Sequence, residues 1–536
     1  MSKIVVVGGG TMGAGIAFVA AAAGFDVDLI EPDAAATDRA KQRIAKDAER
    51  AKKPDARARV QFYAALQTGV QADVAIEAVP ERLELKREIF ARMAQTFDSQ
   101  TLLATNTSSL SVSEIAQDVP HPERVLGLHF FNPPAAMKLV EIVRADETGD
   151  EVIERARALV ERMGKTGVLT ADTPGFIVNR VARPFYLQAM RAYEAGVAPI
   201  DDLDRLARGA GFRMGPFELM DLIGMDVNLA TTQSVYERTG EDRFEPVEAQ
   251  QQLVAENRLG RKSGAGFYDY SQGVPARDDA APQPPAGVNH DETLVVVGYA
   301  GLAVEMHDRL QQRYANVTLW EDEETLDEIG PETTIVFDVG DGANDRADVI
   351  EALDAQLPPE TVIFVDAYAT DMHALAKRLS HFERVVGYGI LSTLEHQRVV
   401  EIVDSDDTSD ESLELAQDLF ETIGCGVALV EDRAGLFLGR TVGSVVNEAV
   451  YVVQEEIATP EDVDLAMRLG TNYPRGPIEW GQEIGGDRIA RILRRLAAQD
   501  GEQFGPSRAL WVLDVQSPED VQQNEYDPFA GVSRNE

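Results

Sequence analysis

A histidine and a glutamate are the side chains in this 536-residue sequence best suited to proton transfer. His129 follows an apolar run that starts at Val125, and Glu141 lies twelve positions further on, in a second apolar run. An imidazole, with an ordinary pKa of about 6.5, can accept a hydroxyl proton near neutral pH. A carboxylate behind it would orient the ring and stabilise its protonated form. The spacing alone favours a hydrogen-bonded core histidine at least as much.

A glycine-rich turn lies at the start of the chain. Gly8, Gly10 and Gly13 follow a β-branched run over 4–7 and precede a helix-compatible stretch. In this pattern the first glycine permits a tight turn, the second lets the backbone approach a pyrophosphate, and the third lets helix and strand pack closely. Glu31 ends the next apolar run, where an acid can bind a ribose 2′-hydroxyl and would repel a 2′-phosphate. We therefore expect NAD rather than NADP, and a hydride-transfer enzyme with His129 as its base; a glycine turn without ligand is the alternative.

The charge of the chain is strongly negative, with 91 acidic against 50 basic residues and a formal net charge of −41. The carboxylates are spread over both halves rather than gathered in one block. Such a surface disfavours nucleic acids and anionic membranes, because their phosphates would repel it. It favours a protein kept soluble in concentrated salt, where screening reduces self-repulsion. The composition predicts a halophilic cytoplasm, and an ordinary acidic protein is the alternative.

The sequence also bears on the compartment. Cys425 is the only cysteine, so no disulfide can form within the chain, and we expect it to be a small buried residue. No run of about 18 apolar residues is present to span a membrane. The start of the chain reads as a strand and a glycine turn, without the basic segment of a secretory signal. We expect a cytoplasmic protein without nucleic-acid or membrane partners.

The order of apolar runs predicts the fold. In the first 150 residues, short apolar runs alternate with helix-like stretches, which is typical of an α/β Rossmann-type fold with a doubly wound parallel sheet. From Glu151 onward helical periodicity dominates, which predicts an all-helical domain. We expect its helices over 152–163, 176–194, 201–211, 217–239 and 247–258.

The second half repeats the plan of the first. Residues 139–143 (LVEIV) match 399–403 (VVEIV) at an offset of 260, and the same offset relates the Asp-Gly pattern at 172–175 to that at 432–435. These matches predict a tandem duplication. We expect a dinucleotide-binding domain over 1–170, a helical domain over 171–270, a linker over 271–292, a degenerate Rossmann-like domain over 293–405, a second helical domain over 406–515 and a tail over 516–536.

Several longer motifs are more specific than these spacings. They are GGGTMG at 8–13, NTSSL at 106–110, GLHFFNP at 127–133, MKLVE at 137–141, DTPGFIVNR at 172–180, GPFEL at 215–219 and GFY at 266–268. In this order, over about the first 270 residues, the chain closely resembles the L-3-hydroxyacyl-CoA dehydrogenase family. The resemblance implies reversible NAD-dependent oxidation of an (S)-3-hydroxyacyl-CoA to a 3-oxoacyl-CoA, as in fatty-acid β-oxidation, and needs no metal.

The resemblance also implies a role for each side chain of the site. His129 matches the family's base, and Glu141 matches its orienting partner. Ser108 and Asn179 match residues that hydrogen-bond the substrate oxygen; from the residues alone they would be a helix cap and an ordinary helix residue. The implied dinucleotide contacts are Gly8, Gly10, Thr11, Met12, Gly13, Glu31, Glu81, Lys86, Asn106, Asn132 and Lys262.

The acyl-CoA contacts are less clear from the sequence. The family has a longer, lysine-rich helical arm after the second strand, whereas the corresponding segment over 33–59 is compact here. Lys52 and Lys53 are its only adjacent lysine pair. They either contact CoA phosphates or belong to a solvated helix face.

The second half resembles the same family but lacks its chemistry. A glycine cannot act as a base, so we expect neither catalysis nor NAD binding there, although Glu401 is kept. Because family dimers pair through their helical domains, the second helical domain could replace a partner subunit and make a pseudo-dimer within one chain; a homo-oligomer is the alternative. The replaced positions are Gly10 (Ala300), Gly13 (Ala303), His129 (Gly389) and Asn179 (Gly439).

Two other functions stay open at this point. One is an NAD-dependent dehydrogenase of a non-CoA hydroxy acid, and the other is a non-catalytic NAD-binding scaffold. The intact set of His129, Glu141, Ser108 and Asn179 argues against the scaffold. The two-half plan also resembles bacterial members of about 500 residues that act on 3-hydroxybutyryl-CoA or 3-hydroxyadipyl-CoA.

Overall fold

A computed structural model describes residues 3–67, 69–277, 279, 282, 290–299, 301–340, 346–368 and 370–514. Ala300, the tail over 516–536 and part of the predicted linker (278, 280–281 and 283–289) lie outside these residues. Where the structure describes the chain, no helix is both long and apolar enough to cross a membrane.

The first sheet has the strand order β3-β2-β1-β4-β5-β6-β7-β8. Its central strands are continuous aliphatic runs, because a strand covered on both faces buries successive side chains. All neighbours are parallel except β6 and β7, which are antiparallel. The strands are β1 (Lys3–Val7), β2 (Asp26–Ile30), β3 (Val60–Tyr63), β4 (Val74–Glu77), β5 (Leu102–Thr105), β6 (Val125–Phe130), β7 (Leu139–Arg144) and β8 (Thr166–Ala171).

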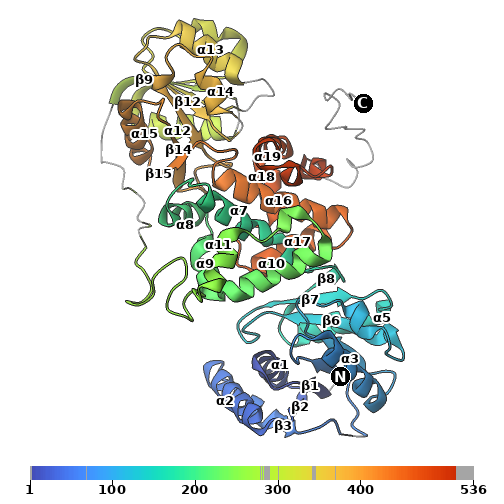
Figure 1. The fold of residues 1–536 in the computed structure, drawn as a ribbon. Helices are drawn as coiled ribbons and strands as arrows, with labels where there is room; N and C mark the ends of the chain where they lie inside the picture. The colour runs from blue at the N-terminus through green and yellow to red at the C-terminus, as the bar shows by residue number, and fades with distance from the viewer. Residues whose placement is uncertain are drawn as a thin grey trace. The chain divides into compact units, whose positions relative to one another are not determined.

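Helices cover both faces of this sheet (Figure 1). On one face, α1 (Thr11–Ala22), α2 (Ala34–Arg50) and α5 (Asp150–Arg162) contribute to one core, and on the other α3 (Leu83–Thr96) and α4 (Val112–Ala116) contribute to a second core. The predicted doubly wound Rossmann fold is confirmed.

One expectation about this region is wrong. The helix predicted over 152–163 does not begin an all-helical part, because α5 packs on the sheet and the chain then returns as β8. Strand β8 is an edge strand whose residues are only partly buried, so its weak apolar pattern did not reveal it.

The following segment is helical, as predicted. The expected helix over 217–239 is divided at Gly224, whose φ of 103° lies in the region that favours glycine. The helices are α6 (Val178–Val181), α7 (Arg183–Glu194), α8 (Ile200–Gly209), α9 (Pro216–Ile223), α10 (Met225–Thr239) and α11 (Glu248–Ala255).

The second half repeats the plan with a seven-stranded sheet in the order β10-β9-β11-β12-β13-β14-β15. Again one pair, β13 and β14, is antiparallel. The strands are β9 (His290–Val297), β10 (Tyr314–Trp320), β11 (Ile335–Asp338), β12 (Val362–Asp366), β13 (Val385–Gly389), β14 (Val399–Asp404) and β15 (Gly426–Glu431). The helices are α12 (Leu302–Gln311), α13 (Arg346–Gln356), α14 (Met372–Ala376), α15 (Asp410–Thr422), α16 (Leu438–Gln454), α17 (Pro460–Gly470), α18 (Pro477–Ile484) and α19 (Gly486–Asp500).

The chain forms two compact units that do not follow its linear order. The first unit contains 1–182, 233–240 and 451–477. The first sheet therefore shares its unit with a segment of the second half. There the backbone N–H of Ala171 donates to the carbonyl of Ile457. Within the second unit, the N–H of Glu431 donates to the carbonyl of Val197. Glu431 lies 260 residues after Ala171 and Val197 lies 260 residues before Ile457, so the two bonds are equivalent. Each sheet is therefore bordered by a helical segment of the opposite half.

Candidate active site

The antiparallel pairing of β6 and β7 places His129 directly opposite Glu141. The Nδ1 atom of His129 lies 2.6 Å from Oε2 of Glu141, and both side chains are buried. The other carboxylate oxygen accepts the backbone N–H groups of Ile177 at 3.0 Å and Val178 at 2.9 Å. The carboxylate thus fixes the ring through Nδ1, which leaves Nε2 as the nitrogen able to accept a proton.

The surroundings of His129 are aromatic on two sides. Its ring centroid lies 4.6 Å from that of Phe131 and 5.7 Å from that of Phe176. The predicted cofactor residue Asn106 accepts the backbone N–H of Phe130 at 2.8 Å. These contacts restrict the movement of the imidazole and of the strand end that carries it.

Ser108 lies on an exposed loop after β5, and Glu81 holds this loop. One oxygen of Glu81 accepts the N–H of Ser108 at 3.0 Å, the N–H of Ser109 at 3.1 Å and the hydroxyl of Thr107. Burial alone would raise the pKa of Glu81, but Lys86 and these hydrogen bonds outweigh it and hold the pKa below its ordinary value. Glu81 is therefore an ionised anchor for the Ser108 loop, a role that the sequence did not indicate.

Lys86 lies buried beneath that loop. Its Nζ atom is 2.8 Å from Glu77 and 3.2 Å from Glu81. The second half keeps a cation and a carboxylate at the corresponding places, where Nε of Arg346 donates to Asp338 at 3.0 Å. Because this pair persists in the half that lacks the site histidine, we assign Lys86 a structural role beside its predicted contact with the dinucleotide.

The glycine turn has the geometry of a phosphate cradle. Gly8 has a φ of 106°, and a Cβ on it would lie 2.6 Å from the carbonyl oxygen of Ala78. A Cβ on Gly13 would lie 1.9 Å from the carbonyl oxygen of Gly8. A Cβ on Gly10, in contrast, would meet nothing within 4 Å. Of these three glycines, only Gly10 has open space beside its backbone. A backbone that is to approach a pyrophosphate closely needs such space.

The start of α1 is also suited to a dinucleotide. Thr11 and Met12 begin the helix, its N-cap residue is Gly10, which has no side chain to cap the first N–H groups, and the first turn contains no acid. The N–H groups and the positive end of the helix dipole are thus available to phosphates. Glu31 accepts the N–H of Gly9 at 2.8 Å and that of Asp33 at 3.0 Å, so its carboxylate lies beside the turn. Its contact with the ribose stays a prediction.

The remaining predicted residues occupy four different places. Asn179 is half-buried in α6, one residue after Val178, and Asn132 is exposed in the loop after β6. Lys52 and Lys53 are exposed just beyond the end of α2. Lys262 belongs to the second compact unit, where its Nζ atom pairs with Asp226.

The corresponding place in the second half is filled by Tyr368. This residue matches Ser108 at the offset of 260, and its hydroxyl donates to Glu401. A Cβ on Gly389 would lie 2.7 Å from the tyrosine ring, and one on Gly439 would lie 2.8 Å from it. One aromatic ring thus occupies the space that the serine, histidine and asparagine use in the first half.

The same offset applied to Ser108 would have revealed Tyr368 in the sequence. Glu401 persists because it accepts the N–H groups of Phe437 at 2.7 Å and Leu438 at 3.2 Å, as Glu141 does for its own loop. The retained glutamate is a structural acceptor in this half.

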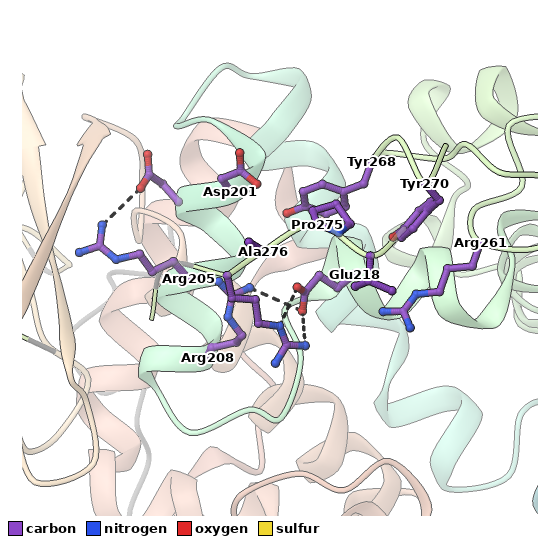
Figure 2. A pocket seen from close by; sticks show the side chains of 12 residues that line it. Asp201, Arg205, Arg208, Glu218, Arg261, Tyr268, Tyr270, Pro275 and Ala276 are labelled. Atoms are coloured by element: carbon purple, nitrogen blue, oxygen red, sulfur yellow. Dashed lines mark hydrogen bonds and ion pairs between the residues drawn. The ribbon is translucent and has the colours of Figure 1, made fainter. Parts of the chain in front are cut away.

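A separate hollow lies in the second compact unit (Figure 2). Its charged groups satisfy one another: Glu218 lies 2.8 Å from Arg277 and 3.6 Å from Arg208. The hydroxyl of Tyr268 donates to Asp204 at 2.8 Å, and burial raises the pKa of Asp204 to about 7. None of the predicted site residues lines this hollow, which is lined by Asp201, Arg205, Arg208, Glu218, Tyr268 and Tyr270 among others. The GFY motif is therefore part of a structural network.

A Rossmann sheet with an open glycine cradle, together with a buried histidine–carboxylate pair, is characteristic of dinucleotide-dependent dehydrogenases. Comparison with known proteins is consistent with this class. The family model described as 3-hydroxyacyl-CoA dehydrogenase, NAD binding domain, matches residues 3–173 and 303–433. The model of the C-terminal domain of the same family matches 175–270 and 435–520. The chain belongs to the 3-hydroxyacyl-CoA dehydrogenase family.

Individual relatives agree with this assignment. The chain is 36% identical over 523 residues to the 3-hydroxyadipyl-CoA dehydrogenase of Escherichia coli, covering 94% of this chain and 95% of that one. It is 38% identical over 282 residues to the probable 3-hydroxybutyryl-CoA dehydrogenase of Bacillus subtilis, covering 51% and 98%. A crystal structure of 3-hydroxybutyryl-CoA dehydrogenase from Escherichia coli matches with a TM-score of 0.76 and 35% identity, covering 95% of this chain and 97% of that one. The protein is an NAD-dependent oxidoreductase of 3-hydroxyacyl-CoA, as predicted.

Proposed function

We propose that His129 is the base of this reaction and that its substrates are short 3-hydroxyacyl-CoA thioesters, including the 3-hydroxyadipyl and 3-hydroxybutyryl forms. The bond between Nδ1 of His129 and the buried carboxylate of Glu141 is the observation that carries the proposal. The match to the 3-hydroxyadipyl-CoA dehydrogenase of Escherichia coli, which covers nearly the whole chain, supports the choice of substrate.

In this proposal each side chain has one task. Ser108 and Asn179 hydrogen-bond the 3-hydroxyl oxygen and hold it toward Nε2 of His129. The imidazole removes the hydroxyl proton, and Glu141 stabilises the imidazolium that forms. NAD, when bound in the glycine cradle, supplies the hydride acceptor for C3. In the reverse direction the imidazolium returns the proton to the carbonyl oxygen.

The test follows NADH absorbance with acetoacetyl-CoA, 3-oxoadipyl-CoA and free acetoacetate, in dilute buffer and in concentrated KCl. Turnover of the thioesters but not of the free acid supports the proposal, and the ratio of the two thioesters gives the chain preference. Turnover of free acetoacetate would indicate a dehydrogenase of non-CoA acids. NADH binding without turnover of any of them would indicate a scaffold.

We further propose that the protein is a cytoplasmic monomer. In it, the two halves of one chain pair in place of the two subunits of a family dimer. The reciprocal backbone bonds of Ala171 with Ile457 and of Glu431 with Val197 support an internal pair. Light scattering on the eluting protein tests this, since a dimeric mass would indicate a homo-oligomer instead.

A further inference from the structure

The first compact unit contains an ion pair between the two halves of the sequence. Glu455, just after the end of α16, binds Arg180 with both carboxylate oxygens, at 2.7 and 2.8 Å. The Arg180 side chain is 4% exposed, whereas the Glu455 side chain is 42% exposed. Such a two-bond arrangement fixes the direction of the arginine as well as its position.

Arg180 belongs to α6, the short helix whose first N–H groups donate to the carboxylate of Glu141. The N–H groups of Ile177 and Val178 at the start of this helix hold Oε1 of Glu141, and Glu141 holds the ring of His129. Asn179, which is predicted to contact the substrate, is the residue immediately before Arg180. A displacement of α6 would therefore reach the base, its partner and the substrate contact together.

The second-half segment also approaches α6 at Gly470. A Cβ on Gly470, at the end of α17, would lie 2.9 Å from side-chain atoms of both Leu139 and Val178. Leu139 begins β7, the strand of Glu141. The segment 451–477 thus packs against both elements that hold the catalytic carboxylate.

The two halves differ at this ion pair although their backbones match. The backbone bonds of Ala171 and Glu431 are equivalent at the offset of 260. The residue equivalent to Glu455 is Ala195 of the first half, so this position offers no carboxylate to the arginine of the second half. That arginine, Arg440, pairs with Asp500 instead. Arg440 also donates to the amide oxygen of Gln188, in the first half, at 3.3 Å. At this pair of equivalent arginines, the described partner from the opposite half is therefore a carboxylate for Arg180 and a neutral amide for Arg440.

We propose that Glu455 is a positioning residue for the reaction: the second half, inactive itself, holds α6 of the first half in place through Arg180. This inference rests on the proposed roles of His129 and Glu141. Removing the carboxylate leaves a buried guanidinium without this partner, which favours movement of α6. Displacements of about 1 Å at a catalytic group can cost about 100-fold in rate.

The experiment compares Glu455→Ala, Glu455→Gln and Glu455→Asp with the wild-type full-length chain. We expect kcat with acetoacetyl-CoA to fall about 10- to 100-fold in Glu455→Ala. Glu455→Gln should fall less, and Glu455→Asp should recover part of the activity. The Kd of NADH should stay within about twofold, because the glycine cradle belongs to β1 and α1 and is not held by α6.

Asp500→Ala is the matched control, since it removes the carboxylate partner of the equivalent arginine, Arg440, in the second unit. It should reduce stability without this loss of kcat. Equal activity of Glu455→Ala and the wild type, or an equal loss in Asp500→Ala, would overturn the proposal.

A second readout does not depend on turnover. The proton between His129 and Glu141 should give a low-field NMR signal, assigned by its absence in His129→Gln. We expect this signal to shift or broaden in Glu455→Ala and to remain in Asp500→Ala. An unchanged signal in Glu455→Ala would overturn the positioning role of Glu455. Because the signal is recorded without substrate, this result does not depend on whether the proposed acyl-CoA substrates are correct.

Discussion

His129 is the residue whose replacement should separate chemistry from binding. In His129→Gln, turnover of acetoacetyl-CoA should fall by about 10²–10⁴-fold, because the general base is gone. NADH titration by fluorescence should give an unchanged Kd, because the cradle does not include this side chain. His121→Gln is the control, since His121 is exposed and pairs only with the nearby Glu123 among the contacts described. Comparable turnover in both variants would contradict the role of His129.

Glu401 provides a pH-dependent prediction for stability. Burial raises its pKa to about 7, from an ordinary value of 4.5. Below pH 4.5 the carboxyl is protonated in the folded and unfolded chains, so its contribution to stability is fully present. Between that value and about pH 7 only the unfolded chain ionises, so stability is lost as the pH rises.

The measurement is urea unfolding of the wild type and Glu401→Gln across this pH range. The shift corresponds to about 3 kcal/mol at about 1.4 kcal/mol per pH unit, so the variant should gain about that much relative to the wild type. The Tyr368 hydroxyl does not interfere, because burial and Glu401 raise its pKa well above its ordinary value. Parallel curves for the two proteins would show that Glu401 ionises normally.

At the scale of elements, the turn between β1 and α1 allows two glycines to be compared. In Gly10→Ala the new methyl group meets nothing within 4 Å, so the unfolding temperature should not change. NADH should bind about tenfold more weakly, because the methyl would occupy space predicted for the pyrophosphate. In Gly13→Ala the methyl would collide with the carbonyl of Gly8, so the domain should lose about 1–3 kcal/mol of stability. Thermal unfolding and NADH titration of both variants measure the two effects. Unchanged NADH affinity in Gly10→Ala would exclude a close backbone approach at this residue.

The antiparallel pairing of β6 with β7 is what places His129 opposite Glu141. The sequence indicated two apolar runs around His129 and Glu141, but not their relative direction. In a parallel arrangement the chain would need a long crossover between them. The eight residues 131–138 between the two strands are too few for such a crossover, which in retrospect favours the antiparallel pair.

At the scale of the whole molecule, the net charge of −41 predicts a response to salt. Raising KCl from about 0.1 M to about 1 M shortens the Debye length from about 10 Å to about 3 Å, which screens the repulsion between surface carboxylates. We expect the thermal midpoint to rise by several degrees. Scanning calorimetry over a KCl series checks this, with sucrose as an uncharged control. A midpoint that stays constant or falls with KCl would contradict the halophilic interpretation.

The sequence by itself determined the Rossmann order of strands and helices, the glycine turn and the duplication, and it named His129 and Glu141 as a candidate pair. These features follow from local patterns, because periodicity reports which residues are buried and glycine reports where the backbone is constrained. Only the tertiary structure decided that backbone N–H groups hold Glu141, that Tyr368 fills the second site and that Glu455 reaches Arg180 across 275 residues. A local pattern shows that a face is buried but not which distant segment covers it, since that depends on how all the elements pack together.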